Sequence, residues 1–168
     1  ELMGLAGAPS TPELDLIRES VENANARIRF FRLAYGAAPD GALAGRGEVV
    51  ATLRAVSRAG RLSYDWEAGG DQPRAEVRAV FLLLQCLESA MPMGGHIRVA
   101  RDPDAWEVTG EGARMRVDEG AWTAMQSPRA RPAEGSALVQ FALLPHALQD
   151  LGRPLALKLA PDRIVARF

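Results

Sequence analysis

Residues 85–99, QCLESAMPMGGHIRV, decide the fold because they join the end of a helix to the start of a strand. After Pro73, the segment AEVRAVFLLLQCLESAM carries apolar residues around most of its circumference, as is typical of a helix buried against a sheet. Pro92 and the pair Gly94–Gly95 then turn the chain into a strand predicted at His96–Arg101. The sequence therefore predicts a helix packed on a sheet at the centre of the domain.

Shorter elements on both sides extend this arrangement into an α+β sandwich, which we assign to residues 45–168. The sheet should be mixed, with the helices on one face. The helices expected are Glu48–Ala59, a short one over 119–126, and Ser136–Leu151 with Pro145 inside it. The strands expected are Arg61–Trp66, Ala105–Thr109, Ala113–Val117, Pro154–Leu159 and Arg163–Phe168. DPDA and GEGA are the expected hairpin turns, and the last two strands turn at APD.

The most regular pattern of the chain lies further upstream, in a helix expected from Thr11-Pro12-Glu13 to Gly36. Its apolar residues step alternately by three and four, which is a heptad seam formed by Leu14, Ile17, Val21, Ala24, Ile28, Phe31 and Tyr35. A second stripe widens this face and consists of Leu16, Ala26, Phe30 and Leu33. So wide an apolar face favours a four-helix bundle over a two-stranded coiled coil.

The residues before this helix predict how the bundle is completed. The chain opens with ELMGLAGAPS, in which Leu2, Met3 and Leu5 resemble the end of a preceding helix and GAPS forms a short connection. A short connection implies an antiparallel neighbour, so we expect a helical hairpin whose first helix lies mostly upstream of Glu1. One hairpin cannot close a bundle, and we therefore predict a homodimer formed through a first module at residues 1–38.

Composition excludes several classes of protein. The apolar fraction of 48% is that of a globular protein, and the net charge of −1 gives no case for binding nucleic acid. The longest apolar run, Ala79–Leu84, is too short to span a bilayer. The single cysteine, Cys86, rules out an internal disulfide framework and fits a reducing, cytoplasmic environment. We expect neither nucleic acid nor membrane as a partner.

Catalytic and metal-binding motifs are missing from the sequence. Neither histidine, His96 or His146, has the spacing of a metal site or a nucleophile–base pair, and Cys86 lies on a buried helix face. We therefore predict no metal site and no catalytic residue within these residues.

A candidate binding patch lies in the second half of the long helix, where Arg27, Arg29 and Arg32 alternate with Phe30 and Phe31. One interpretation is a solvated helix edge. The other is a basic, aromatic docking patch for an acidic partner protein, with Arg27, Phe30 and Arg32 as the partner-binding residues.

The order of these parts resembles that of the ChpT-type histidine phosphotransferases. A bundle helix that ends in RIRFFRLAYG is followed by SYDW, by LLLQCLESAMPMGGHIRV, by a last helix and by LGRPLALKLAPDRIVARF. The resemblance covers the whole chain and is most specific at residues 19–36, with the Gly94–Gly95 turn next. It implies a dimeric phosphotransfer bundle joined to a degenerate domain of the Bergerat type, similar to the ATPase domain of histidine kinases.

Aligned on Gly94–Gly95, the chain departs from the kinase pattern at each part of the nucleotide site. Cys86, between Gln85 and Leu87, stands where kinases have the asparagine that binds Mg²⁺, and sulfur is a poor ligand for so hard a cation. Val108 of VTGEG stands where the kinase aspartate binds adenine, and SPRARPAEGSALVQF offers Gly135 alone as a phosphate loop. The resemblance therefore implies no ATP binding and no cofactor.

The mechanism that the resemblance implies is phosphoryl transfer between receiver-domain aspartates through a histidine on the first bundle helix. The receiver domain would bring Mg²⁺, and the histidine would lie upstream of Glu1 by about one to two dozen residues. Two alternatives stay open. One is an ATP-binding histidine kinase or anti-sigma-type kinase, and the other is a scaffold that binds receiver domains without transfer.

Overall fold

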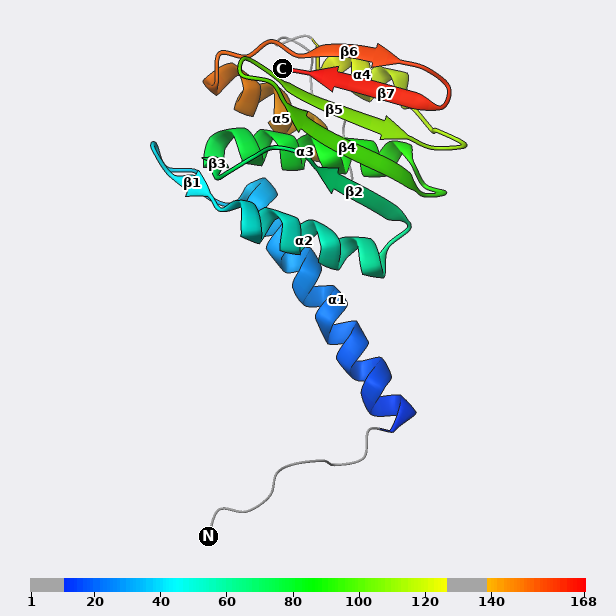
Figure 1. The fold of residues 1–168 in the computed structure, drawn as a ribbon. Helices are drawn as coiled ribbons and strands as arrows, with labels where there is room; N and C mark the ends of the chain where they lie inside the picture. Colours follow the sequence, from blue (N-terminus) through cyan, green and yellow to red (C-terminus); the bar gives the residue numbers. More distant parts are fainter. Residues whose placement is uncertain (1–10, 127–138) are drawn as a thin grey trace.

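The computed structural model describes residues 11–126 and 139–168. In chain order they form α1 (Pro12–Tyr35), β1 (Leu43–Ala44), α2 (Arg46–Ala59), β2 (Leu62–Trp66), β3 (Gln72–Pro73), α3 (Arg74–Ala90), β4 (Gly95–Arg101), β5 (Trp106–Glu111), α4 (Glu119–Ala124), α5 (Val139–Asp150), β6 (Ala156–Leu159) and β7 (Arg163–Arg167) (Figure 1). Among these residues, no helix combines the length and the apolar character that crossing a bilayer requires.

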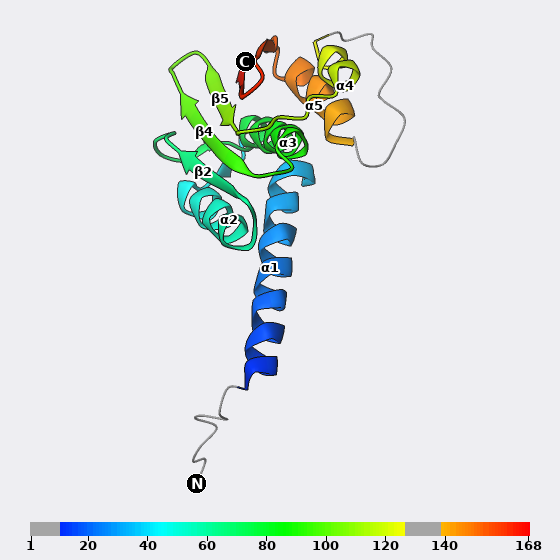
Figure 2. The same cartoon turned by 90° about the vertical axis from the view of Figure 1, so that its right-hand side faces the viewer.

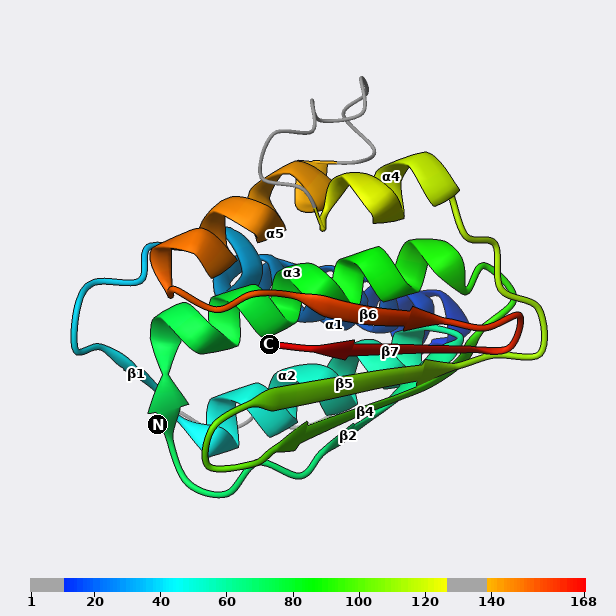
Figure 3. The same cartoon turned by 90° about the horizontal axis from the view of Figure 1, so that it is seen from above.

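The five strands β2, β4, β5, β7 and β6 form one mixed sheet in that order, beside a small β1–β3 pair. β2 runs parallel to β4, and the other neighbours are antiparallel. Figure 3 shows α3 running along the sheet, with α5 beyond it on the same side. Ile97, Val99, Trp106 and Val108 point into this helical layer and are fully buried. The α+β sandwich predicted from the sequence is confirmed.

One predicted strand, Ala113–Val117, is wrong, and GEGA is therefore not a hairpin turn. β5 continues to Glu111, which pairs with Arg163 of β7. The strand that flanks β5 on the side away from β4 therefore comes from the end of the chain. The residues that follow leave the sheet: the Arg116 N–H donates to the carbonyl of Ala90 at 2.7 Å and holds this segment against the end of α3.

The predicted long helix is confirmed at both ends. The Thr11 side chain accepts a hydrogen bond from the Leu14 N–H at 3.4 Å, and the Gly36 N–H donates to the Arg32 carbonyl at 3.1 Å. Arg74 of α3 caps the same end, because its guanidinium donates to the carbonyls of Arg32 and Ala37 at 3.2 and 3.0 Å. Figure 2 shows that α1 projects from the sandwich with its first half clear of it.

The second half of α1 enters the core of the sandwich. Ala26, Phe30 and Leu33 are buried, and the Phe30 ring lies 4.9 Å from that of Phe81 in α3. The second apolar stripe is predicted to face a bundle, and for these three residues that prediction is wrong, since they are buried within the sandwich instead. Leu16, the fourth member of the stripe, is exposed.

The Gly94–Gly95 turn has a structural role. Gly94 has φ +94°, and a Cβ at this position would lie 2.5 Å from the carbonyl oxygen of Arg61. A Cβ at Gly95 would collide with the carbonyl oxygen of Glu111 in β5, while the Gly95 N–H donates to the Arg61 carbonyl at 3.2 Å. Gly94 is therefore needed to bring the start of β4 against the start of β2, and Gly95 is needed to bring it against the end of β5, whether or not a ligand binds nearby.

A buried ionic cluster, formed by Glu76, Arg101, Arg153 and Trp106, joins the other end of α3 to the sheet. The Glu76 carboxylate, which is buried, accepts hydrogen bonds from Trp106 Nε1 at 2.7 Å and from Arg153 Nη2 at 3.2 Å. It also forms an ion pair with Arg101. The cluster therefore ties α3 to β4, to β5 and to the segment that follows α5.

Candidate functional site

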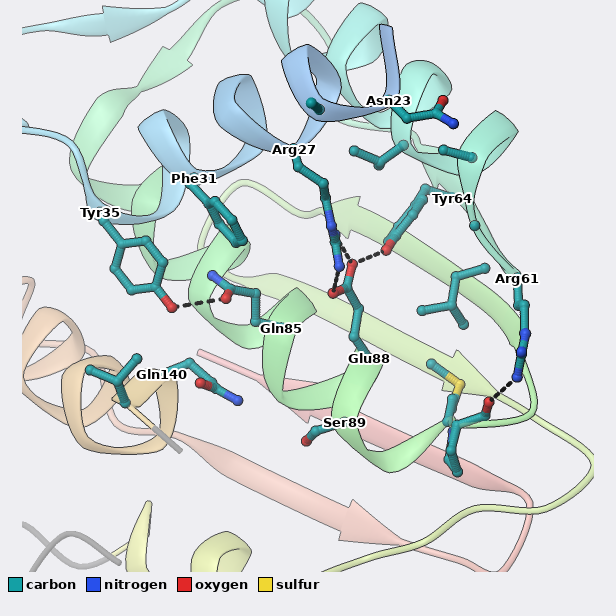
Figure 4. Close-up of a pocket in the computed structure, with 18 residues that line it drawn as sticks. Asn23, Arg27, Phe31, Tyr35, Arg61, Tyr64, Gln85, Glu88, Ser89 and Gln140 are labelled. Carbon is teal, nitrogen blue, oxygen red and sulfur yellow. Dashed lines mark hydrogen bonds and ion pairs between the residues drawn. The ribbon is translucent and has the colours of Figure 1, made fainter. Parts of the chain in front are cut away.

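A groove of about 1130 Å³ lies between α1, α3 and the start of α5, and residues of α2 and β2 close one end (Figure 4). Gln85, Glu88 and Ser89 of α3 line it, and Phe31 and Tyr35 of α1 line it from another side. These two residues also belong to the predicted heptad seam, so the groove continues the apolar face of α1 into the sandwich.

Arg27 and Glu88 form the main polar contact in the groove. The guanidinium donates two hydrogen bonds to the carboxylate, at 3.0 and 2.9 Å, and these hydrogen bonds raise the pKa of Arg27. Tyr64 of β2 donates its hydroxyl to the same carboxylate at 2.5 Å, and Tyr35 donates to Gln85 at 2.8 Å. Only 16% of the Glu88 side chain is exposed. This network therefore links α1, α3 and β2.

We expect Tyr64 to make the domain less stable in alkali. Burial, together with the negative charge of Glu88, raises the pKa of Tyr64 above its ordinary value of 10.0. Above pH 10 the unfolded chain loses this proton while the folded protein keeps it, so the free energy of unfolding falls as pH rises. Tyr64→Phe should flatten this fall in urea titrations between pH 9 and pH 11. An unchanged slope would show that Tyr64 ionises as easily when folded as when unfolded.

Tyr35 provides the control for this experiment. Its pKa is also raised, chiefly by burial, but its hydrogen bond to Gln85 opposes the shift. Tyr35→Phe should therefore also flatten the fall of the unfolding free energy between pH 9 and pH 11, but by less than Tyr64→Phe does.

The predicted seam is largely solvent-exposed in the single chain. Its larger apolar members are exposed, and they are Leu14, Ile17, Val21, Ile28 and Phe31. Ala24 is exposed as well, whereas Tyr35 is partly buried and bonded to Gln85. An apolar stripe of this length on a projecting helix is typical of a surface that another helix covers. The homodimer stays a prediction.

The three predicted partner-binding residues have different environments. Phe30 is fully buried against Phe81, so the prediction that it contacts a partner is wrong. Arg27 is paired with Glu88 and only partly exposed. Arg32 is 66% exposed and lies 3.8 Å from Glu48, so of the three it is the most accessible.

Cys86, which the resemblance aligns with the magnesium-binding asparagine of kinases, lies among apolar side chains. Cys86 is fully buried, and its thiol donates to Met125 Sδ, just after α4, at 3.8 Å. Burial raises the pKa of this thiol well above its ordinary value, so it stays protonated. Trp122 of α4 is also buried and lies edge-on to Phe141 of α5, with ring centroids 5.5 Å apart. A thiol and a thioether are poor ligands for Mg²⁺.

Two further positions matter for the resemblance to the nucleotide site of kinases. Val108, which the resemblance aligns with the adenine-binding aspartate, is fully buried in β5. Gly135 lies outside the described residues. Within residues 11–126 and 139–168, no three His, Cys, Asp or Glu side chains come together in a way that could hold a metal ion.

Neither histidine lies on the bundle helix. His146 is exposed on α5, and His96 lies on β4 with both ring nitrogens engaged. Its Nδ1 is 2.8 Å from the Ser63 hydroxyl, and its Nε2 is 3.2 Å from an Asp65 carboxylate oxygen. Sequence reasoning missed this contact, because it depends on the parallel register of β2 and β4, which brings Ser63 opposite His96.

Comparison with known proteins agrees with this geometry. A family model described as the histidine phosphotransferase C-terminal domain matches residues 46–163. A bacterial phosphotransferase solved at 1.7 Å superposes with a TM-score of 0.73 at 22% identity, over 92% of this chain and 77% of that chain. The histidine kinase domain of the blue-light-activated kinase EL346 from Erythrobacter litoralis superposes with a TM-score of 0.52 at 14% identity, over 95% of this chain and 87% of that chain.

Both structural likenesses lie under 25% identity and show the fold alone. No curated protein sequence matches the chain.

Proposed function

Because this chain belongs to the histidine phosphotransferase C-terminal domain family, we propose that it passes phosphoryl groups between the aspartates of receiver domains without using ATP. The accepting histidine would lie on a helix upstream of Glu1 that pairs with α1. Two such hairpins would form the four-helix bundle of a homodimer. The observation that carries this proposal is the exposed heptad seam of α1. It is supported by Cys86, which the resemblance aligns with the magnesium-binding asparagine of kinases and which is buried against Met125.

The chemistry needs little from the sandwich itself. A neutral imidazole nitrogen attacks the phosphorus of the receiver's aspartyl phosphate, the bond between phosphorus and the aspartate oxygen breaks, and the carboxylate leaves. The reverse step, with a second receiver, returns the phosphoryl group to an aspartate. Magnesium bound by the receiver would stabilise the charge that develops, so positioning of the two proteins is what this chain would supply.

Phosphotransfer profiling of the full-length protein tests the proposal. The protein is incubated with purified receiver domains that carry labelled phosphate, and we expect acid-labile phosphate to appear on it and then on a second receiver. Replacing the accepting histidine should abolish both signals. Receiver binding without labelled protein would instead support the scaffold alternative.

We expect ATP to leave the thermal stability of this protein unchanged. A ligand that binds only the folded state raises the melting temperature, and ATP with Mg²⁺ at 100 times its dissociation constant would add about 2.7 kcal/mol. A titration of ATP with and without Mg²⁺, followed by thermal shift, provides the measurement. A stabilisation that depends on magnesium would favour the kinase alternative, in spite of the buried Cys86.

Arg32→Glu should weaken receiver binding and spare the fold. Arg32 is largely exposed, and its distance of 3.8 Å to Glu48 gives it little part in stability. Reversing its charge should lower the affinity for a phosphorylated receiver by about tenfold, whereas Arg32→Lys should retain most of it. Calorimetric titration measures the affinity, and circular dichroism checks the fold. An unchanged affinity in Arg32→Glu would remove Arg32 from the docking surface.

A further inference from the structure

Arg27 is the outermost residue of α1 that bonds to the sandwich. Its guanidinium pairs with Glu88 of α3, and Figure 4 shows the two side chains meeting in the groove. Within residues 11–126 and 139–168, no side chain before Arg27 on α1 hydrogen-bonds or pairs with another element. Those that bond do so inside the helix, as Arg18 does with Asp15 at 3.6 Å. The Arg27–Glu88 pair therefore lies where α1 leaves the sandwich.

The pair fixes a direction, which an apolar contact does not. Two hydrogen bonds of 3.0 and 2.9 Å join the planar guanidinium to the planar carboxylate, and such a fork holds the two groups in one mutual orientation. The Arg27 guanidinium also lies over the rings of Phe30 and Phe31, 5.5 and 5.8 Å from their centroids. The burial of Phe30 holds α1 against the sandwich, but the hydrophobic effect that drives it has no direction.

Glu88 is itself held from the side of the sandwich. Tyr64 of β2 donates its hydroxyl to Oε1 of Glu88, the same oxygen that accepts from Nη1 of Arg27. Only 16% of the Glu88 side chain is exposed. Because α3 carries Glu88 and β2 holds its carboxylate, Glu88 cannot follow α1 outward. A change in the direction of α1 would have to break the bonds to Arg27.

We propose that Glu88 is a positioning residue for phosphoryl transfer, an inference that rests on the proposed function. Glu88 acts through Arg27, which passes the orientation of α3 and β2 to α1 and so to the helix that pairs with the exposed seam. Neither residue takes part in making or breaking a bond to phosphorus. Transfer needs the attacking nitrogen, the phosphorus and the leaving oxygen in line, so a seam held in one direction supports a faster transfer step.

A second contact between α1 and α3 separates positioning from stability. Tyr35 donates to Gln85 at 2.8 Å, and it lies about two turns closer to the buried end of α1 than Arg27 does. Loss of either contact should lower the stability of the domain. Only the loss of the outermost contact, between Arg27 and Glu88, should slow transfer, since the apolar core already holds α1 at Tyr35.

The test measures transfer and stability on the same full-length variants. Glu88→Gln keeps the shape of the side chain and an acceptor for Tyr64 but loses the charge, and Arg27→Lys keeps the charge but loses the fork. Gln85→Leu is the matched control, because it removes the acceptor of Tyr35. The probe is a labelled phospho-receiver that exchanges phosphate with the wild type. Quenched-flow single turnovers over a range of receiver concentrations give the transfer rate and the half-saturating concentration separately.

We expect Glu88→Gln and Arg27→Lys to slow transfer at saturating receiver by about tenfold or more, with a half-saturating concentration within about twofold of the wild type. Gln85→Leu should keep both values within about twofold, even where urea unfolding shows it to be as destabilised as Glu88→Gln. Circular dichroism confirms that each variant is folded.

Two results would overturn the role of Glu88. One is a saturated rate that stays at the wild-type value in Glu88→Gln, which would leave the pair with a role in stability alone. The other is a weaker affinity at an unchanged saturated rate, which would place Arg27 in contact with the receiver. If the wild type exchanges phosphate with no receiver, the proposed function itself fails.

Discussion

Glu76→Ala is expected to destabilise the domain by about 3–5 kcal/mol. The carboxylate is buried and accepts from Trp106 Nε1 and Arg153, besides its ion pair with Arg101. Removing it leaves the buried indole N–H of Trp106 without an acceptor and takes the carboxylate from Arg101 and Arg153, which keep only their bonds to Gln72 and to the Asp104 carbonyl. The cost is thus that of one unsatisfied buried donor together with two lost ion pairs.

Urea unfolding followed by far-UV circular dichroism measures this effect. Glu67→Ala is the control, because Glu67 is paired with Arg98 at 2.8 Å on the exposed face of the sheet, and its loss should leave the free energy of unfolding nearly unchanged. The loss of unfolding free energy in Glu76→Gln should lie between those of Glu76→Ala and Glu67→Ala, since an amide oxygen can still accept from Trp106. A Glu76→Ala variant as stable as the wild type would show that the cluster adds no net stability.

Phe30→Ala and Phe31→Ala should separate the two roles of α1. Phe30 is fully buried against Phe81, so its truncation should cost about 3–5 kcal/mol in unfolding at any protein concentration. Phe31 is 42% exposed on the seam and should contribute mainly to pairing with another copy. Phe31→Ala in the full-length protein should raise the dimer dissociation constant by about tenfold or more.

Analytical ultracentrifugation over a range of concentrations gives the dissociation constant, and urea unfolding gives the stability. If Phe31→Ala destabilised the monomer as much as Phe30→Ala, the seam would be part of the sandwich core. If the wild type were a monomer at all concentrations, the predicted bundle would be wrong while the core role of Phe30 would stand.

The extent of α1 could be predicted because its signals are local. Thr11, Pro12 and Gly36 lie at the ends of the helix, and the spacing of the seam residues gives its period. Periodicity does not say what an apolar stripe touches. For that reason the sequence pattern places Ala26, Phe30 and Leu33 with the bundle, whereas the structure buries them in the core of the sandwich.

The contacts at the groove could not be predicted, because each joins residues far apart in the chain. Arg27 and Glu88 are 61 positions apart, and Tyr64 reaches the same carboxylate from β2. The α4 helix was predicted over 119–126, but nothing in its sequence indicated that Trp122 and Met125 would be buried, or that Met125 would meet Cys86. The false strand at 113–117 has the same origin, since strand pairing depends on β7, about 50 residues later.

α1 runs without a break from its exposed seam into the core of the domain, so a small rotation at its buried end displaces its other end. Pro12–Tyr35 spans about 36 Å at 1.5 Å per residue, and Phe30, Leu33 and Arg74 clamp one end. A rotation of only about 5° at the clamped end would move the opposite tip by about 3 Å, comparable to a hydrogen-bond length. A small change of side-chain packing around Phe81 would therefore shift the N-terminal end of α1 by several times that distance relative to the sandwich.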